Sequence, residues 1–545
     1  MTASTDRADR PASGRIASTM IAAGIFLSRI AGLVRERLVA MCFGTGLHAD
    51  VFGAALRMPN VLQNLLGEGT LSASFIPVYS ELLGKGRNEE AGRVAGAMFA
   101  LLLAVAGGIA LLGIVFAPGL VTLFTPGFEG QRRELMIALV RILFPMTGVL
   151  VLSAWTLGIL NSHRRFFVPY FAPVLWNVAI IAVLFGYRHA ALDKLLMAAA
   201  WGALLGGVLQ FSFQLPFVLK VERNLRIGRM RSEAGFREAV SNAGPAILGR
   251  GVVQLSGYVD MVLASLLAIG AVARLRYAQT LYVLPVSLFG MSIAAAELPE
   301  LARAGSGAAE ALRERLIAAV RRVSFYVVPS LVAFVVLGQI VVAGVYQSGH
   351  FGSADATLVW YTLMAYSLGL LASTNARVYQ SAFYALRDTR TTARIAMLRV
   401  LVSAICGCAL MLQFEPVALG TLHIPAGVLS TLRADGLPLG PLGLATGATL
   451  GAWFEWTMLR RALARRIGSV GAGAGQLLRM FTAAALAAAL AYALSLLLRH
   501  LHPLPMAACV GATYGAVYFA AARALGLAEA VAFSRTLKRR FGRRA

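Results

Sequence analysis

Apolar segments of about 20 residues recur along almost the whole 545-residue chain, and they constrain its fold more than any other feature. A helix needs about 20 such residues to cross the hydrocarbon core of a bilayer. Only 14% of the residues are charged, whereas a soluble protein carries roughly 25%. The runs are continuous rather than alternating, which is not the pattern of a membrane β-barrel. The sequence therefore predicts an all-α integral membrane protein.

The apolar runs divide into fourteen predicted spans. The first run lacks a small-residue cleavage site, so we expect it to remain as the first membrane helix rather than to act as a signal peptide. The spans are 16–38, 47–66, 92–116, 135–160, 167–187, 195–219, 239–268, 271–296, 316–344, 356–386, 392–412, 438–460, 476–498 and 505–527.

The basic residues fall unevenly in the loops between these spans. The net charge is +25, which in a soluble protein would suggest a nucleic acid partner. Here 33 Lys and Arg lie in one set of alternating loops and 10 in the other. The positive-inside rule then places both termini in the cytoplasm and explains the charge without nucleic acid. The segment 535–544 is either a binding site for anionic lipids or a stop-transfer anchor.

A weak internal repeat divides the chain. Gly32 and Gly257 are 225 residues apart, as are Arg165 and Arg390, and Pro59 and Pro285 are 226 apart. An offset of six helices predicts two six-helix lobes in the same membrane orientation, with the substrate site between them. The predicted domains are a cytoplasmic tail (1–15), an N-lobe (16–219), a basic linker (220–237), a C-lobe (238–460), two extra helices (461–528) and a basic cytoplasmic tail (529–545).

Seven arginines lie inside or at the ends of the predicted spans. A charge near the bilayer centre costs about 2.5–3.5 kcal/mol on insertion scales, so such residues usually face water or a partner. Arginine is suited to phosphates, because its planar guanidinium donates paired hydrogen bonds and stays charged. An anionic substrate, such as a pyrophosphate, would therefore fit a cavity lined by them. The seven are Arg29, Arg57, Arg141, Arg250, Arg377, Arg399 and Arg523.

The first span carries the most informative pair, Arg29 and Arg35. Six residues correspond to about 240° around an ideal helix, so the two share a face only if the helix bends, for which Gly32 is a suitable position. The alternative is structural, with pairs such as Arg35–Glu36 or Arg29–Asp50 holding helices together. We favour substrate binding, and the candidate residues are Arg29, Arg35, Glu36, Asp50, Arg57, Asn60 and Glu68.

Two acceptors at membrane depth, Asp260 and Asn375, are candidates for a sodium site. Pro59 and Pro285 would free backbone carbonyls that add to such sites. A single hydrogen-bonded contact within the bundle explains each acceptor equally well. The sequence contains neither a HExxH motif nor a Walker loop, so we expect a protein that is not an enzyme and not an ATP-driven pump.

Several sequence blocks carry a family resemblance over residues 15 to about 460. They are Ser28-Arg29-x-x-Gly32-x-x-Arg35-Glu36, Asp50-x-Phe52, Pro59-Asn60, Gly67-Glu68-Gly69, Phe75-Ile76-Pro77, Gly244-Pro245-Ala246, Tyr277-Ala278 through Pro285 to Gly290, and Phe383-Tyr384-Ala385-x-x-Asp388-Thr389-Arg390-Thr391. The chain resembles the MurJ (MviN) lipid II flippase family of the multidrug/oligosaccharidyl-lipid/polysaccharide exporter superfamily.

The resemblance implies alternating access around a cationic cavity, with lipid II, an undecaprenyl-pyrophosphate disaccharide-pentapeptide, moved to the outer leaflet for peptidoglycan synthesis. It also implies a groove for the lipid tail on the last two helices, and Na⁺ or the membrane potential as the driving force. Two arginines usual in the family are Gln63 and Thr280 here, for which Arg57 or Arg276 are possible substitutes.

These departures keep two alternatives open: a flippase or exporter for another polyprenyl-pyrophosphate glycan, and a degenerate scaffold that does not transport. A cationic cavity disfavours a third reading, a cationic-drug antiporter, because it would repel such drugs.

Overall fold

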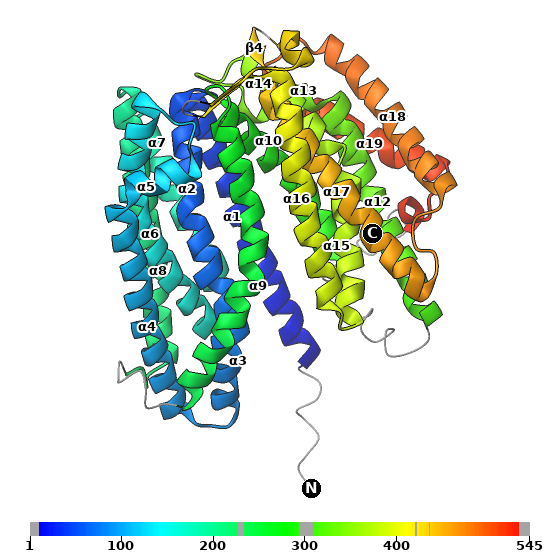
Figure 1. The fold of residues 1–545 in the computed structure, drawn as a ribbon. Helices are drawn as coiled ribbons and strands as arrows, with labels where there is room; N and C mark the ends of the chain where they lie inside the picture. Colours follow the sequence, from blue (N-terminus) through cyan, green and yellow to red (C-terminus); the bar gives the residue numbers. More distant parts are fainter. Residues whose placement is uncertain (1–9, 227–233, 294–308, 420–421, 435, 533–545) are drawn as a thin grey trace. The chain divides into compact units, whose positions relative to one another are not determined.

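The computed structural model describes residues 10–226, 234–293, 309–419, 422–434 and 436–532, and they are almost entirely helical (Figure 1). The chain divides into two compact units, Met1–Val262 and Leu263–Ala545. Most of each predicted tail (1–9 and 533–545) and the middle of the predicted basic linker (227–233) lie outside the described residues, and the predicted domain limits stay predictions.

Unit 1 is a bundle in which α6 is the central helix. It packs against α2, α3, α4 and α8, while α1 packs along α7. Trp155 of α6 is fully buried, and its indole donates to the carbonyl of Ala95 on α4 at 3.1 Å. The helices are α1 (Arg10–Phe43), α2 (Leu47–Leu66), α3 (Glu68–Gly84), α4 (Asn88–Val115), α5 (Ala117–Phe124), α6 (Gly130–Ser162), α7 (Phe167–Gly186), α8 (Leu192–Val221) and most of α9 (Ala234–Ser265).

Unit 2 contains the remaining helices and two small antiparallel hairpins, β1–β2 and β3–β4, between α16 and α17. Its elements are α10 (Ala271–Pro285), the π-helix η1 (Val286–Met291), α12 (Ala309–Val336), α13 (Gly338–Tyr346), α14 (Ser353–Ser367), α15 (Leu370–Ala385), α16 (Thr389–Phe414), β1 (Val417–Leu419), β2 (Leu422–Ile424), the 3₁₀ turn η2 (Val428–Thr431), β3 (Arg433–Ala434), β4 (Leu437–Pro438), α17 (Gly440–Ile467), α18 (Ala474–Leu497) and α19 (Pro503–Ala524).

Helix breaks recur at matching places in the two units, as the predicted repeat requires. In unit 1, α4 ends at Val115 and the short α5 follows after Phe116; in unit 2, α12 ends at Val336 and the short α13 follows after Leu337. The breaks have the same hydrogen bonding, because the N–H of each break residue donates to the carbonyl four residues earlier. Each unit thus has a helix of 28 residues followed by a break and a short helix.

Two arginines adopt a left-handed backbone at corresponding helix ends. Arg164, after α6, has φ 58°, and Arg387, after α15, has φ 57°. Each closes a Schellman turn: the next residue donates from its N–H to the carbonyl five positions back, as in Arg165 to Leu160 at 2.8 Å. A side chain in this conformation costs roughly 1 kcal/mol relative to glycine. The same strained turn is thus present in both units.

The helices account for all fourteen predicted spans, although the number of membrane crossings stays a prediction. Each predicted span overlaps one helix, or a pair of helices that follow each other directly. In the described residues, eight helices are long and apolar enough to cross a membrane, and up to nine if α14 and α15, bent by 42° at their junction, form one span. Two short helices, α3 and α5, lie where no span was predicted.

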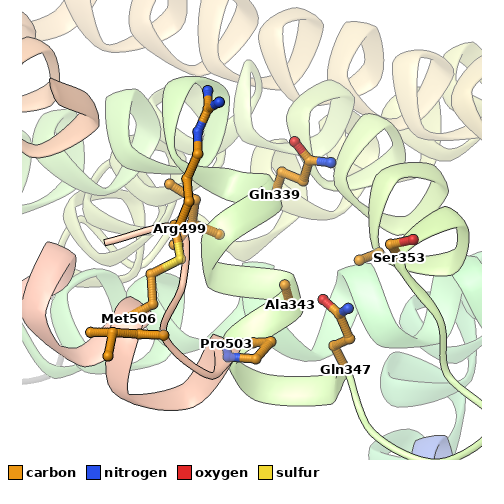
Figure 2. Close-up of a pocket in the computed structure, with 10 residues that line it drawn as sticks. Gln339, Ala343, Gln347, Ser353, Arg499, Pro503 and Met506 are labelled. Carbon is orange, nitrogen blue, oxygen red and sulfur yellow. The ribbon is translucent and has the colours of Figure 1, made fainter. Parts of the chain in front are cut away.

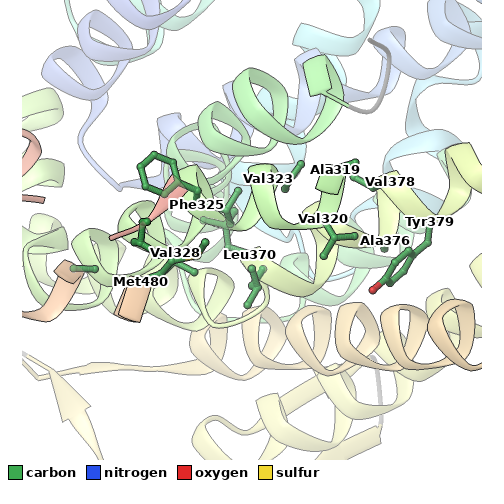
Figure 3. Packing of buried hydrophobic residues seen from close by; sticks show 14 of the residues in the cluster. Ala319, Val320, Val323, Phe325, Val328, Leu370, Ala376, Val378, Tyr379 and Met480 are labelled. Atoms are coloured by element: carbon green, nitrogen blue, oxygen red, sulfur yellow. The ribbon is translucent and has the colours of Figure 1, made fainter. Parts of the chain in front are cut away.

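The last two helices, α18 and α19, pack against the other helices of unit 2, and α18 does so mainly through small residues. The buried cluster in Figure 3 joins Val323 and Phe325 of α12 to Leu370 of α15 and Met480 of α18. On α19, the hydroxyl of Tyr518 donates to the carbonyl of Phe325 at 2.6 Å. The buried face of α18 is otherwise mostly alanine, which allows close helix approach in a membrane: Ala483, Ala484, Ala487, Ala488 and Ala491.

Candidate functional site

The two arginines of α1 lie in different surroundings, as their six-residue separation predicts. The side chain of Arg29 is exposed, and it has no ion-pair partner among the described residues. Arg35 is 15% exposed, and its Nη2 donates to Oε1 of the buried Glu36 at 2.7 Å. The helix runs unbroken through Gly32. Arg29 is thus free to meet an anion, whereas Arg35 keeps one carboxylate as a fixed neighbour.

An aromatic ring positions Arg35. Its Cζ lies 4.7 Å from the ring centroid of Trp176 on α7. The indole of Trp176 in turn donates to the carbonyl of Ala203 on α8 at 3.0 Å. A guanidinium stacked on an indole gains about 0.5–2 kcal/mol and keeps its in-plane donors available. Arg35 is therefore held in one orientation with its Nε–H still without a hydrogen-bond partner among the described residues.

Arg57 of α2 is half-buried and lies against the backbone of α9. A Cβ placed on Gly257 would be 2.9 Å from Nη2 of Arg57, so only glycine leaves room for the guanidinium in this position. The next residue, Tyr258, donates from its hydroxyl to the carbonyl of Met58 at 3.3 Å. Among the described residues, no carboxylate pairs with Arg57. This arginine is therefore a second cation of unit 1 without a counter-ion from the protein.

The acidic candidates have different roles in the structure. Asp50 is fully buried and accepts from Nη2 of Arg132 at 3.0 Å, and the guanidinium of Arg132 also lies 4.0 Å from the ring centroid of Phe128. Asp50 thus joins α2 to α6, and it is not paired with Arg29. Asn60 is half-buried on α2, and the side chain of Glu68 lies outside the described residues.

The two residues predicted for sodium binding belong to different units. Asn375 is 4% exposed, donates from Nδ2 to Oγ of Ser324 at 3.4 Å, and leaves its Oδ1 without a partner among the described residues. Asp260 is half-buried at the end of unit 1 and has interactions of its own. No group of three or more His, Cys, Asp or Glu is placed for a metal ion in the described part of the chain. One free amide oxygen is compatible with a cation site but does not define one.

Unit 2 contains an ion pair between α16 and α17 that was not predicted from the sequence. Nη1 of Arg399 donates to Oε2 of Glu455 at 2.6 Å, and Glu455 also accepts from Nε2 of Gln380 at 2.8 Å. Glu455 is the one acidic residue within the predicted span 438–460, and that isolation was the available signal. Arg399 therefore has a partner within the bundle, one of the two outcomes expected for it.

The motif that begins at Asp388 forms the start of α16. Asp388 is the N-cap: it accepts from the N–H of Thr391 at 3.0 Å and from Oγ1 of Thr391 at 2.7 Å. Nη2 of Arg466, at the end of α17, donates to the same carboxylate at 2.5 Å. The Thr391 hydrogen bonds, with a smaller contribution from Arg466, lower the pKa of Asp388 to about 2. This part of the resemblance therefore has a structural explanation.

A pocket of about 240 Å³ lies between α13, the start of α14, the turn that follows α18 and the start of α19 (Figure 2). Gln339, Ala343 and Gln347 form one stripe of α13 beside Arg499, from the turn between α18 and α19. None of the residues predicted to bind substrate lines it. It is a mainly apolar pocket with a single cation, Arg499, and it is distinct from the arginine positions of α1 and α2.

The fold and these arginines define the class of the protein: a multi-pass membrane transporter rather than an enzyme. Residues 39–432 match the family model described as lipid II flippase MurJ, and the chain belongs to this family. The block at 28–36, which contains Arg29, Arg35 and Glu36, precedes the matched range.

Individual relatives agree with this assignment. The chain is 32% identical to the lipid II flippase MurJ of Burkholderia cenocepacia over 379 residues, 68% of this chain and 73% of the relative. It is 31% identical to the probable lipid II flippase MurJ of Haemophilus influenzae over 428 residues, 75% of this chain and 82% of the relative.

Solved structures show the same fold. A lipid II flippase MurJ in an inward closed conformation matches with a TM-score of 0.73 at 21% identity, covering 92% of this chain and 98% of that one. An inward-facing multidrug resistance transporter of the MATE family matches with a TM-score of 0.62 at 20% identity, covering 81% and 96%.

Proposed function

We propose that this protein flips lipid II from the cytoplasmic to the periplasmic leaflet of the inner membrane, with both termini in the cytoplasm. Membership of the MurJ family supports this function. The observation that carries the mechanism is that Arg29 and Arg57, both within predicted membrane spans, have no carboxylate partner among the described residues. An uncompensated charge at membrane depth is costly, so an anionic substrate that neutralises it is a physical reason for its presence.

The positions of the arginines in unit 1 support a set of proposed substrate contacts. Arg29, Arg35 and Arg57 would donate to the pyrophosphate, with Asn60 as a neutral hydrogen-bond donor on the same helix as Arg57. Glu36 would orient Arg35 rather than touch the anion, because like charges repel and Glu36 is already paired. Asp50 would serve the same structural purpose for Arg132. The position of Glu68 at the start of α3 keeps it a candidate for contacts with the polar headgroup.

Coupling to Na⁺ is a second part of the proposal. It is supported by the free Oδ1 of Asn375 and by Asp260, each an oxygen donor at membrane depth. Anionic lipids would bind the basic cytoplasmic loops and the basic tail, where clustered Lys and Arg attract negative headgroups.

A complementation experiment tests the proposed function. The chain is expressed in cells depleted of their own lipid II flippase, and growth and lipid II translocation are measured. We expect rescue by the native sequence and none by Arg35→Ala at equal membrane abundance. Good expression without rescue would favour the two alternatives, a flippase for another polyprenyl-pyrophosphate glycan or a scaffold that does not transport. Accumulation of a different lipid-linked glycan would distinguish the first from the second.

A further inference from the structure

Helix α15 of unit 2 is buried on almost every side. Between Leu370 and Phe383, every residue is buried except Arg377, which is exposed, and Gln380, which is half-buried. The neighbouring α16 shows the opposite pattern, because only 11% of its apolar window is buried, as expected for a helix that faces lipid. Arg377 thus lies on a narrow exposed face of a largely buried helix, which it shares with the half-buried Gln380 and the exposed Tyr384.

Arg377 belongs to a short chain of polar side chains near the middle of three helices. Its Nη1 donates to Oε1 of Gln380 at 3.4 Å, a weak contact, and Gln380 donates to Glu455, which also accepts from Arg399. The hydroxyl of Tyr282 on α10 lies within electrostatic range of these charges, and it hydrogen-bonds Oγ of Ser373 at 2.7 Å.

The charges of this network do not cancel. It contains two guanidinium groups, Arg377 and Arg399, and one carboxylate, Glu455, which is taken by Arg399. One positive charge is left, and it resides on the residue with the most exposed side chain. Apart from the weak contact with Gln380, the donors of Arg377 have no protein partner among the described residues. Arg377 lies roughly halfway along α15. An unpaired guanidinium at that position of a membrane helix favours the binding of an anion.

We infer that Arg377 is an anion-binding residue of unit 2 that contacts a phosphate of the lipid-linked substrate, and that Gln380, Glu455 and Arg399 hold it in place. The inference rests on the proposed function and adds a contact outside α1 and α2. The pairing of Glu455 with Arg399 prevents the carboxylate from neutralising Arg377, so that this guanidinium stays available. A hydroxyl from Tyr282 or Ser373 supplies a neutral polar neighbour without adding charge.

Binding measurements on the full chain in phosphatidylcholine nanodiscs test this assignment. The probes are undecaprenyl pyrophosphate, undecaprenol, which has the same chain without phosphate, and phosphatidylglycerol. The variants are Arg377→Gln and Arg377→Lys, with Arg394→Gln as the matched control, because Arg394 is an exposed arginine of α16 without an ion pair among the described residues. Loss of charged hydrogen bonds predicts that Arg377→Gln weakens undecaprenyl pyrophosphate binding at least about tenfold.

The selectivity of the effect separates a phosphate contact from a structural role. We expect undecaprenol binding to be unchanged in Arg377→Gln, and Arg394→Gln to bind both probes like the native protein. Equal losses for both polyprenyl probes, or an unchanged affinity for undecaprenyl pyrophosphate, would overturn the inference. So would an equal loss for phosphatidylglycerol, which would make Arg377 a site for membrane lipid. If Arg377→Gln does not fold, Arg377→Lys must still bind the pyrophosphate more weakly, because the ammonium lacks the planar pair of donors.

Arg35→Ala distinguishes failure of this inference from failure of the proposed function. If Arg35→Ala weakens undecaprenyl pyrophosphate binding and Arg377→Gln does not, the proposed function stands and only the unit 2 contact is lost. If the native protein shows no preference for undecaprenyl pyrophosphate over undecaprenol, the proposed function fails with it.

Discussion

The guanidinium of Arg35 lies 4.7 Å above the indole of Trp176, and the indole is anchored by its hydrogen bond to Ala203. Through these contacts, α1, α7 and α8 together determine where one cation points. The arrangement requires a planar cation, because stacking uses one face of the guanidinium while its edge donates hydrogen bonds.

Substitution of Arg35 by lysine tests this requirement. Lys keeps the charge but loses the stacked plane and the paired donors, so we expect Arg35→Lys to transport much less lipid II than the native protein. Trp176→Leu should reduce transport as well, by an amount consistent with the roughly 0.5–2 kcal/mol of a cation–π contact. Translocation assays in vesicles measure both. Native rates in Arg35→Lys would show that charge alone is sufficient.

A methyl group at Gly257 should displace Arg57. The added Cβ would lie 2.9 Å from Nη2 of Arg57, which must move, while the helix itself gains about 1 kcal/mol from the better helix former. We therefore expect Gly257→Ala to reduce transport without lowering the thermal midpoint of unfolding. The control is Gly107→Ala on α4, where an added Cβ meets nothing within 4 Å. A loss of transport in Gly107→Ala equal to that in Gly257→Ala would remove the role of the contact with Arg57.

The stability of the protein should fall more when one partner of the Arg399–Glu455 pair is replaced than when both are replaced. Glu455→Leu leaves Arg399 unpaired inside the bundle and should destabilise the protein by about 2 kcal/mol, less than for a fully buried pair because the side chain of Arg399 is 31% exposed. The double variant Glu455→Leu/Arg399→Leu should recover part of this loss. Thermal unfolding in detergent gives the comparison. A double variant less stable than Glu455→Leu would mean that the pair contributes through packing instead.

A partly buried histidine, His163, should make the stability of unit 1 sensitive to acid. His163, which follows α6, lies 2.9 Å from the hydroxyl of Tyr79 and 4.0 Å from Glu222. Burial lowers the pKa of His163 below 6.5, against the smaller effect of Glu222. The unfolded chain therefore binds a proton at His163 more readily than the folded protein does. The contribution of neutral His163 to the free energy of unfolding is present above pH 6.5, and it is lost as the pH falls through the lower pKa of the folded state.

The matching variant is His163→Gln, which keeps a hydrogen-bonding side chain without a titrating ring. We expect the midpoint of thermal unfolding to fall less between pH 7 and pH 5 in His163→Gln than in the native protein. The same decrease in both proteins would assign the acid sensitivity to other groups.

The hydropathy of the chain was sufficient to predict nearly every long helix, because each apolar run must become helical in lipid. It did not predict α3, whose residues 68–84 include Thr70, Ser74 and Pro77 and lack a long apolar run. The hairpins between α16 and α17 were also missed, because their strands are only two or three residues long.

The candidate site was less predictable, because its chemistry depends on partners far apart in the sequence. Arg132 and Asp50 are 82 residues apart, and Arg399 and Glu455 are 56 apart. Sequence analysis identified the arginines by their cost in a membrane but could not show which of them have a counter-ion. The contact of Trp176 with Arg35 could not be predicted either, because Trp176 looks in the sequence like any other aromatic residue of an apolar span.

The left-handed turns at Arg164 and Arg387 have a consequence for how divergent relatives of this chain are compared. The corner has an arginine at the left-handed position in both units, and it pairs Arg164 with Arg387 and therefore Arg165 with Asp388, two residues away from the pairing of Arg165 with Arg390 in the sequence repeat. Alignments of the two halves should therefore be anchored on these corners, and a glycine found at either place in another sequence is an equivalent residue rather than a mismatch.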